Sequence, residues 1–235
     1  MDMLLTASFR ALKSVFAPGM FGVFLWSIFL TMLALIAFVV LAGYASGFLA
    51  TQLDNPEWAS ILPFVGTLGA GLIAWFLFPG IMPIIVNFFD ARIAYLIEAR
   101  DYPESMATNP TAFWPEFWHD ARFSLMAVTL NILILPLYLF MPGLHLIPFY
   151  LLNGYLLGRE FFVMAARRHI PIQEALVLRR KNGRTVLIAG VGLAILATLP
   201  LVNLLAPFWG IAVMVHLFHS VSPRPKAILV NNTAY

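Results

Sequence analysis

The chain has 235 residues, of which 61% are hydrophobic and 11% are charged. A soluble domain carries about 25% charged residues, so this composition excludes an ordinary soluble fold and requires a bilayer as solvent. There is no cysteine, which excludes disulfides, thiolate metal sites and cysteine nucleophiles. The net charge of +3 gives no reason to expect a nucleic-acid partner in a chain this apolar.

Four runs contain no Asp, Glu, Lys or Arg: residues 14–53, 58–89, 123–158 and 185–223. Each exceeds the roughly 20 residues that a spanning helix needs. The sequence therefore predicts an all-α, multi-pass integral membrane protein with a single membrane domain over residues 1–235.

Residues 1–17 are predicted to form an amphipathic helix in the bilayer interface. Arg10, Lys13 and Ser14 are expected to point away from the apolar side, which comprises Leu4, Leu5, Phe9, Leu12, Val15 and Phe16. The apolar run that follows is too long for a secretory signal, so we expect the N-terminus to be retained.

The Pro18-Gly19 break precedes a first predicted span at residues 19–50, in which Gly43 and Gly47 have the GxxxG spacing that permits close helix packing. A second span is predicted at residues 61–98, with an amphipathic end.

In that amphipathic end, Arg92 lies on the face opposite Asp90, Ala94, Glu98 and Asp101, which is the wrong side for a solvated charge. A structural ion pair is one reading of Arg92, and anion passage is the other. Residues 101–122, with three prolines and four aromatic residues near their middle, are predicted to be a surface loop with interfacial anchors.

The two remaining apolar runs predict helical hairpins at residues 123–158 and 185–219. A break at residues 141–143 leaves arms of 18 and 15 residues, and a break at residues 200–207 leaves arms of 15 and 12. At 1.5 Å per residue these arms are about 27, 23, 23 and 18 Å long, less than the roughly 30 Å hydrocarbon core. Four thin or tilted spans joined by apolar turns remain the alternative.

Residues 159–184 form a basic loop that holds seven of the fourteen Lys and Arg residues, and residues 220–235 a polar tail. A short helix is predicted between Pro171 and Asn182. Its basic end, Arg179, Arg180 and Lys181, should face anionic lipid headgroups, and the positive-inside rule places the loop in the cytoplasm.

Catalytic patterns such as HExxH, GxSxG and the P-loop are missing, so no enzyme activity is predicted. His216 and His219 are expected to cap an apolar helix without nearby carboxylates, with metal binding as the minor alternative. His145 and His169 are expected to be hydrogen-bonded structural residues.

Three asparagines, Asn131, Asn153 and Asn203, lie in or beside apolar runs, where an amide must find a partner. Interhelical hydrogen bonds are one reading, and a polar wall to a permeation path is the other. Gly154 and Gly158 repeat the GxxxG spacing, and Arg159-Glu160 follows them, either as a surface ion pair or as part of an anion path.

From Asn153 onward, NGYLLGREFF, RRHIP, EALVLRR, PLVNLLAP and MVHLF resemble the CysZ-type sulfate permease and etoposide-induced membrane protein superfamily. The resemblance is close over the C-terminal third and looser over the two long spans. It implies an all-helical inner-membrane protein that assembles as a homo-oligomer among membrane lipids, needs no cofactor or metal, and admits sulfate for cysteine synthesis.

One feature departs from the resemblance. Sulfate permeases of the family carry arginines after the Pro-Gly-Leu turn, whereas this turn reads Pro18-Gly19-Met20-Phe21-Gly22. Only backbone contacts to an anion carry over there, and Arg92 or Arg159 is expected to substitute. The candidate anion-binding or pore residues are Gly19, Met20, Phe21, Arg92, Asn153, Arg159, Glu160 and Asn203. A non-transporting scaffold that organises lipid or partner proteins is the alternative function.

Overall fold

The structure is a computed structural model that describes residues 2–52, 56–107, 113–140, 146–199 and 202–222. Every regular element in these ranges is helical, which confirms the all-α prediction. The chain divides into two compact units: unit 1 comprises residues 1–17 and 92–235, and unit 2 comprises residues 18–91. The predicted break at residues 141–143, His145 and residues 223–235 of the tail lie outside the described residues.

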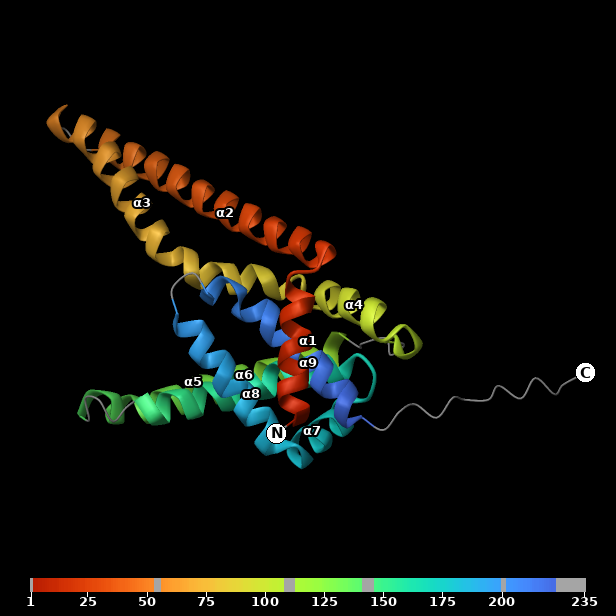
Figure 1. Cartoon of the computed structure of the whole chain (residues 1–235). Helices are drawn as coiled ribbons and strands as arrows, with labels where there is room; N and C mark the ends of the chain where they lie inside the picture. Colours follow the sequence, from red (N-terminus) through yellow and green to blue (C-terminus); the bar gives the residue numbers. More distant parts are fainter. Residues whose placement is uncertain (1, 53–55, 108–112, 141–145, 200–201, 223–235) are drawn as a thin grey trace, which may run out of the picture. The chain divides into compact units, whose positions relative to one another are not determined.

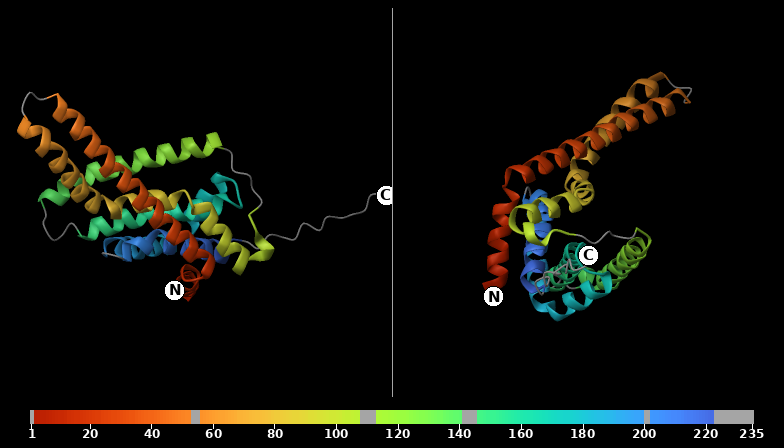
Figure 2. Two further views of the ribbon diagram at one scale, coloured as in Figure 1. Left: turned by 90° about the horizontal axis from the view of Figure 1, so that it is seen from above. Right: turned by 90° about the vertical axis from the view of Figure 1, so that its right-hand side faces the viewer.

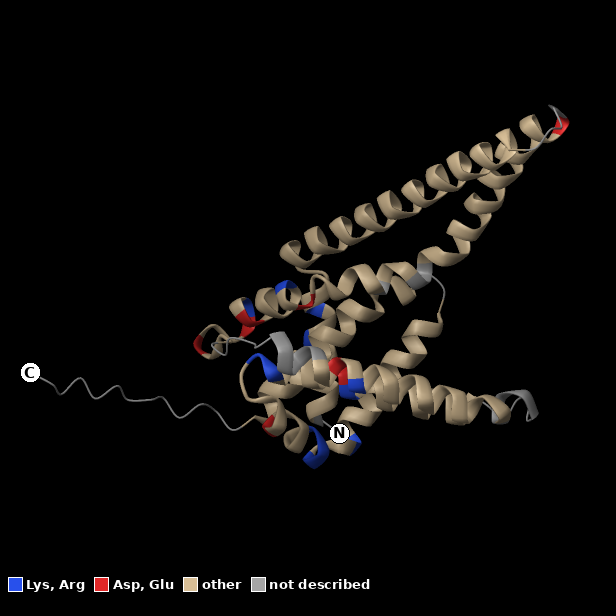
Figure 3. Ribbon diagram, turned by 180° about the vertical axis from the view of Figure 1, so that it is seen from behind, with Lys and Arg blue, Asp and Glu red and all other residues tan. Residues whose placement is uncertain are grey.

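Unit 2 is a hairpin of two long helices, α2 (Pro18–Thr51) and α3 (Pro56–Asn87), that run side by side (Figure 1). Charged residues are nearly absent along both helices (Figure 3). Residues Pro18–Thr51 and Glu57–Phe78 are long and apolar enough to cross a membrane. Most side chains of α2 are exposed on the protein surface, as expected for an apolar helix that is surrounded by lipid.

Small residues bring α2 and α3 together. A methyl group added at Gly43 would lie 2.7 Å from Thr67 Oγ1, so the predicted GxxxG position is a contact point. Ser46 faces Gly66 across the same interface. The Ser46 and Thr67 hydroxyls donate to carbonyls of their own helices at 2.9 and 2.8 Å, so no polar group is left unpaired at the contact.

Unit 1 is organised around α9 (Ala206–Val221), with α1 (Asp2–Val15) packed along it (Figures 1 and 2). The buried residues of α1 are Val15 and three small residues, Ala7, Ala11 and Ser14. The large apolar side chains predicted for one side are mostly turned outward, with Phe9 68% exposed. Ser14 was expected to point away from the apolar side and instead lies buried against α9, because a small residue lets the helices approach.

The second span ends earlier than predicted, at Asn87, and a turn leads into a separate helix, α4 (Asp90–Asp101). Two residues of the α4 face predicted to be solvated are buried: Ala94 and Glu98 are 0% and 1% exposed. Arg92 is exposed, contrary to the prediction. The prediction failed because Glu98 has ionic partners, Arg168 and His169, that the periodicity of the helix does not reveal.

Residues 101–122 are not one surface loop. A short 3₁₀ turn, η1 (Pro103–Ser105), follows α4, and α5 (Phe113–Phe140) has already begun at Phe113. Pro115 does not interrupt α5 because the first turn of a helix has no internal partner for that N–H.

The two helices of the predicted first hairpin are longer than its uncharged run, because the charged residues at their ends are helical too. Helix α5 has 28 residues and α6 (Leu146–Arg167) has 22, or about 42 and 33 Å at 1.5 Å per residue. The predicted arms of 18 and 15 uncharged residues are therefore the apolar parts of these longer helices, and the helical hairpin at residues 123–158 stays a prediction.

In the second predicted hairpin, α8 (Gly183–Thr198) has 16 residues, about 24 Å, and is shorter than the hydrocarbon core. The 3₁₀ turn η2 (Val202–Leu205) joins α9, and together they give a 20-residue candidate span, Val202–Val221. That span is 67% buried within the protein, whereas Pro18–Thr51 is 22% buried. Helix α9 is therefore the core of unit 1, not a lipid-facing helix.

Helices α6 and α8 touch backbone to backbone. A methyl group at Gly158 would lie 2.6 Å from the Val186 carbonyl oxygen, and one at Gly154 would lie 2.8 Å from the Val191 backbone. From α8, Gly190 faces the backbones of both Gly154 and Gly158. The predicted close packing at Gly154 and Gly158 is confirmed.

We expect the free energy of unfolding of Gly190→Ala to be about 2 kcal/mol lower than that of Gly192→Ala, because the new methyl group at position 190 must push two helix backbones apart. Both substitutions carry the same gain in helix propensity, and a methyl group at Gly192 meets Trp209 only at 3.7 Å. Thermal and denaturant unfolding in detergent would measure the difference. Equal stability of the two variants would show that the α6–α8 contact is looser than described.

Candidate functional site

The predicted site residues fall in both units. Gly19, Met20 and Phe21 form the first turn of α2 in unit 2, where Met20 is buried and Phe21 is exposed. Five predicted residues lie in unit 1: Arg92, Asn153, Arg159, Glu160 and Asn203.

Arg92 and Asn153 each interact with a residue of their own helix. The guanidinium of Arg92 lies 5.5 Å from the centre of the Tyr95 ring and makes no ion pair with any described residue. The Asn153 amide donates to the Phe149 carbonyl at 2.9 Å, a bond within α6 instead of the predicted bond between helices. Asn203 is half-buried in η2.

Asn131 repeats the pattern of Asn153 and donates to the Ala127 carbonyl of its own helix at 2.9 Å. The predicted interhelical bonds of these two amides are therefore replaced by bonds one turn back along the helix.

Arg159 is half-buried at the point where α6 leaves its uncharged segment. Its guanidinium carbon lies 4.1 Å from the centre of the Phe123 ring, and Nη2 lies 3.3 Å from His119 Nε2. Nη1 is buried and has no hydrogen-bond partner among the described residues. No carboxylate in the described part of the chain is within ion-pair distance of Arg159, and Glu160 and Asp120 act on its charge only from a greater distance.

A second arginine lies beside the same turn of α6. Helix α7 (Ile172–Lys181) was predicted from its caps and is confirmed. Arg179 is half-buried, and its guanidinium carbon lies 4.8 Å from the centre of the Tyr155 ring. Tyr155 is one helical turn before Arg159 on α6. Its Nε is also buried without a partner among the described residues. We call Arg159, Arg179 and Tyr155 the arginine cluster.

The three basic residues at the end of α7 therefore differ. Arg180 and Lys181 are exposed, as a lipid-facing role requires, whereas Arg179 turns toward α6. The sequence suggested a lipid-facing role for all three residues. Helix periodicity does not separate Arg179 from its neighbours unless the position of α6 is known.

Asp120, an acidic residue near the arginine cluster, pairs with another cation, Arg167. Both carboxylate oxygens of Asp120 accept from Arg167 Nη1 at 3.1 Å. Burial, followed by the charge of Asp120, raises the pKa of Glu160 above its ordinary value.

A buried carboxylate that sequence reasoning placed on the solvated face ties α4 to the turn between α6 and α7. Glu98 Oε2 accepts from Arg168 Nη2 at 3.0 Å, and Oε1 lies 2.9 Å from His169 Nε2. Burial opposes ionisation of Glu98, but the hydrogen bonds from His169 and Arg168 outweigh it and hold the pKa of the carboxyl below its ordinary value. The prediction that His169 is a hydrogen-bonded structural residue is confirmed.

The two histidines of α9 are not helix caps at an apolar end. His216 is fully buried, with Tyr102 Oη 2.9 Å from Nδ1 and Ser14 Oγ 3.1 Å from Nε2. The ring of His219 stacks on Tyr102 at 3.9 Å. The expectation that no carboxylate is near is wrong, because α4 brings Asp101 to 3.7 Å from His216 and Glu98 to the surroundings of His219.

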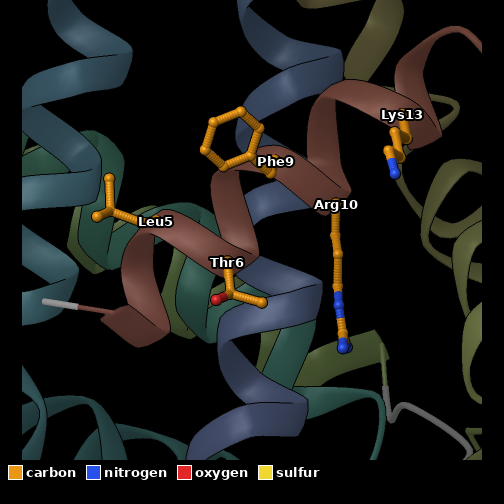
Figure 4. A pocket seen from close by; sticks show the side chains of 5 residues that line it. All are labelled: Leu5, Thr6, Phe9, Arg10 and Lys13. Atoms are coloured by element: carbon orange, nitrogen blue, oxygen red, sulfur yellow. The ribbon is translucent and has the colours of Figure 1, made fainter.

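A cavity of about 380 Å³ lies on the outer face of α1 (Figure 4). It is lined by Leu5, Thr6, Phe9, Arg10 and Lys13, all from one helix. Two cations beside apolar side chains are typical of a helix at the boundary between headgroups and acyl chains, and the interfacial position of α1 stays a prediction.

These features define an all-helical membrane protein with buried ionic groups concentrated in unit 1. The sequence model of the family described as Sulfate transporter CysZ/Etoposide-induced protein 2.4 matches residues 7–207. The chain therefore belongs to that family, which is of a transporter type and not an enzyme family. A comparison with curated proteins finds no match.

We expect Glu98→Gln to lower the free energy of unfolding by about 3 kcal/mol, because it removes the anion of an ion pair whose carboxylate is 1% exposed. Asp120→Asn is the matched control: Asp120 is 41% exposed, against 1% for Glu98, and its loss should cost about 1 kcal/mol or less. Unfolding in detergent micelles, followed by tryptophan fluorescence, measures both. A Glu98→Gln variant as stable as the wild type would contradict the assigned ion pair.

Proposed function

We propose that the protein is a permease for sulfate or a related oxyanion, and that the arginine cluster of Arg159, Arg179 and Tyr155 is its anion-binding site. The observation that carries the proposal is the pair of half-buried guanidinium groups, neither of which forms an ion pair with a described carboxylate. The family supports the substrate class.

A tetrahedral oxyanion must lose much of its hydration on leaving water, so a path through a membrane protein has to supply replacement donors. Arginine offers five N–H groups in a planar fork that matches oxyanion geometry. Arg159 Nη1 and Arg179 Nε are buried donors without a described partner, so an anion would gain hydrogen bonds without displacing any. The aromatic rings of Phe123 and Tyr155 keep each guanidinium in place.

Arg159 is a better candidate than Arg92 for the missing family arginines. Arg92 is exposed on α4, whereas Arg159 is half-buried directly after a run of apolar helix. The backbone N–H groups of Gly19, Met20 and Phe21, at the start of α2, would contribute a separate anion contact, and Asn153, Glu160 and Asn203 would line the path.

The wider biological setting follows from the family. We propose that the chain lies in the inner membrane of a bacterium, that its basic segment from Arg159 to Arg184 faces the cytoplasm, and that it assembles as a homo-oligomer. The sulfate it admits would supply cysteine synthesis. Arg180 and Lys181, both exposed, would contact anionic lipid headgroups.

Labelled-sulfate uptake into proteoliposomes tests the proposal. Wild-type protein should exceed empty vesicles, and Arg159→Gln and Arg179→Gln should each lower flux by about tenfold or more, because each removes a charged donor to the anion. Arg180→Gln, which changes the exposed neighbour of Arg179, is the matched control and should keep most of the flux.

Two results would contradict this proposal. Flux equal to that of empty vesicles would favour the scaffold alternative, in which anionic-lipid binding depends on Arg180 and Lys181. Equal flux in the Arg159, Arg179 and Arg180 variants would show that the anion passes elsewhere.

A further inference from the structure

We propose that Glu98, His169 and His219 form a binding site for one divalent transition-metal ion of the Zn²⁺ type. The three residues come from three separate segments of unit 1: α4, the turn between α6 and α7, and the last turn of α9. One ligand atom from each lies within 4.8 Å of the others.

The chemistry of the three side chains suits a borderline metal ion. Two imidazoles and one carboxylate form a common ligand set for zinc and related ions in proteins, and three protein ligands leave a fourth position for water or an anion. With metal–ligand bonds of about 2.0 to 2.1 Å, tetrahedral ligand atoms stand about 3.4 Å apart. His169 Nε2 and Glu98 Oε1 are 2.9 Å apart, and the ligand atom of His219 lies within 4.8 Å of both, so side-chain rotations have to bring the three atoms to that common spacing.

A second observation separates this cluster from an ordinary hydrogen-bonded ion pair. His219 Nε2 is buried and has no hydrogen-bond partner among the described residues. A buried polar atom without a partner is costly, and an ion is one of the few groups that satisfies it. Stacking on Tyr102 at 3.9 Å and 12° fixes the plane of the His219 ring.

The surrounding residues act as a supporting shell. Arg168 donates to both carboxylate oxygens of Glu98, at 3.3 and 3.0 Å, and so fixes the carboxylate plane. A carboxylate has about four lone-pair positions, so the guanidinium and a metal ion can share it. Ligating carboxylates in metal sites are commonly hydrogen-bonded in this way. His169 is oriented by stacking on Phe218 at 4.9 Å.

Metal binding would replace the hydrogen bond between His169 Nε2 and Glu98 Oε1 with two bonds to the ion, and His219 would supply the third. Where His169 Nε2 carries the proton, binding releases that proton to solvent. The ion would then join the ends of α4, α6 and α9 at one place.

The test is isothermal titration of Zn²⁺ into the full-length protein, purified without a polyhistidine tag and treated with a chelator that is then removed. The wild type should bind one Zn²⁺ per chain. His169→Gln and His219→Gln should weaken that binding by about tenfold or more, because each removes one of three ligands. Thermal unfolding without metal verifies that the variants are folded.

His119→Gln is the matched control, because His119 also lies beside a carboxylate, 3.2 Å from Asp120, but in a separate cluster. Its Zn²⁺ affinity should equal that of the wild type. Absence of saturable Zn²⁺ binding by the wild type, or binding that His169→Gln and His219→Gln leave unchanged, would overturn the proposal. Co²⁺ provides a second readout: the wild type should show visible absorption bands that are absent in the folded His219→Gln variant.

Discussion

The backbone contact between α6 and α8 determines the arrangement of the functional part of unit 1. Gly154, Gly158 and Gly190 let the two helices meet without side chains between them. The chain links these helices through α7, which begins five residues after α6 ends and finishes two residues before α8 begins. If α6 and α8 are in contact, α7 must run back along α6, and this return places Arg179 above Tyr155.

The distribution of ion pairs in unit 1 then decides which cations are free to meet an anion. Arg168 is held by Glu98, and Arg167 by Asp120. Each of these pairs fixes a helix end, α4 in the first case and α5 in the second. Arg159 and Arg179 contact aromatic rings instead of carboxylates. An aromatic face orients a guanidinium without forming an ion pair with it, so these two arginines remain able to attract an oxyanion.

The sequence predicted the helical fold well because each long element carries its own signal. Uncharged runs marked α2 and α3, prolines and caps marked α7, and GxxxG spacing marked the α6–α8 contact. The failures have a common cause, which is that a single helix does not reveal its partners. Glu98 was placed on a solvated face because periodicity cannot show that Arg168 and His169 neutralise it, and Ser14 was placed outside because its partner His216 is 202 residues away.

The candidate site was predicted only in part for the same reason. Arg159 could be selected because it interrupts an apolar pattern, whereas Arg179 was grouped with two lipid-facing neighbours. Only the return of α7 along α6 separates it from Arg180. The length of α5 was underestimated because its charged and proline-containing start resembled a loop.

The most direct measurement of the central claim is the position of a bound oxyanion. Selenate has the shape and charge of sulfate, and its selenium atom can be located by anomalous X-ray scattering in crystals of the protein. Our account predicts a selenium peak within hydrogen-bonding reach of the guanidinium groups of both Arg159 and Arg179. A peak at Arg92 or Arg180 and none at the arginine cluster would contradict it.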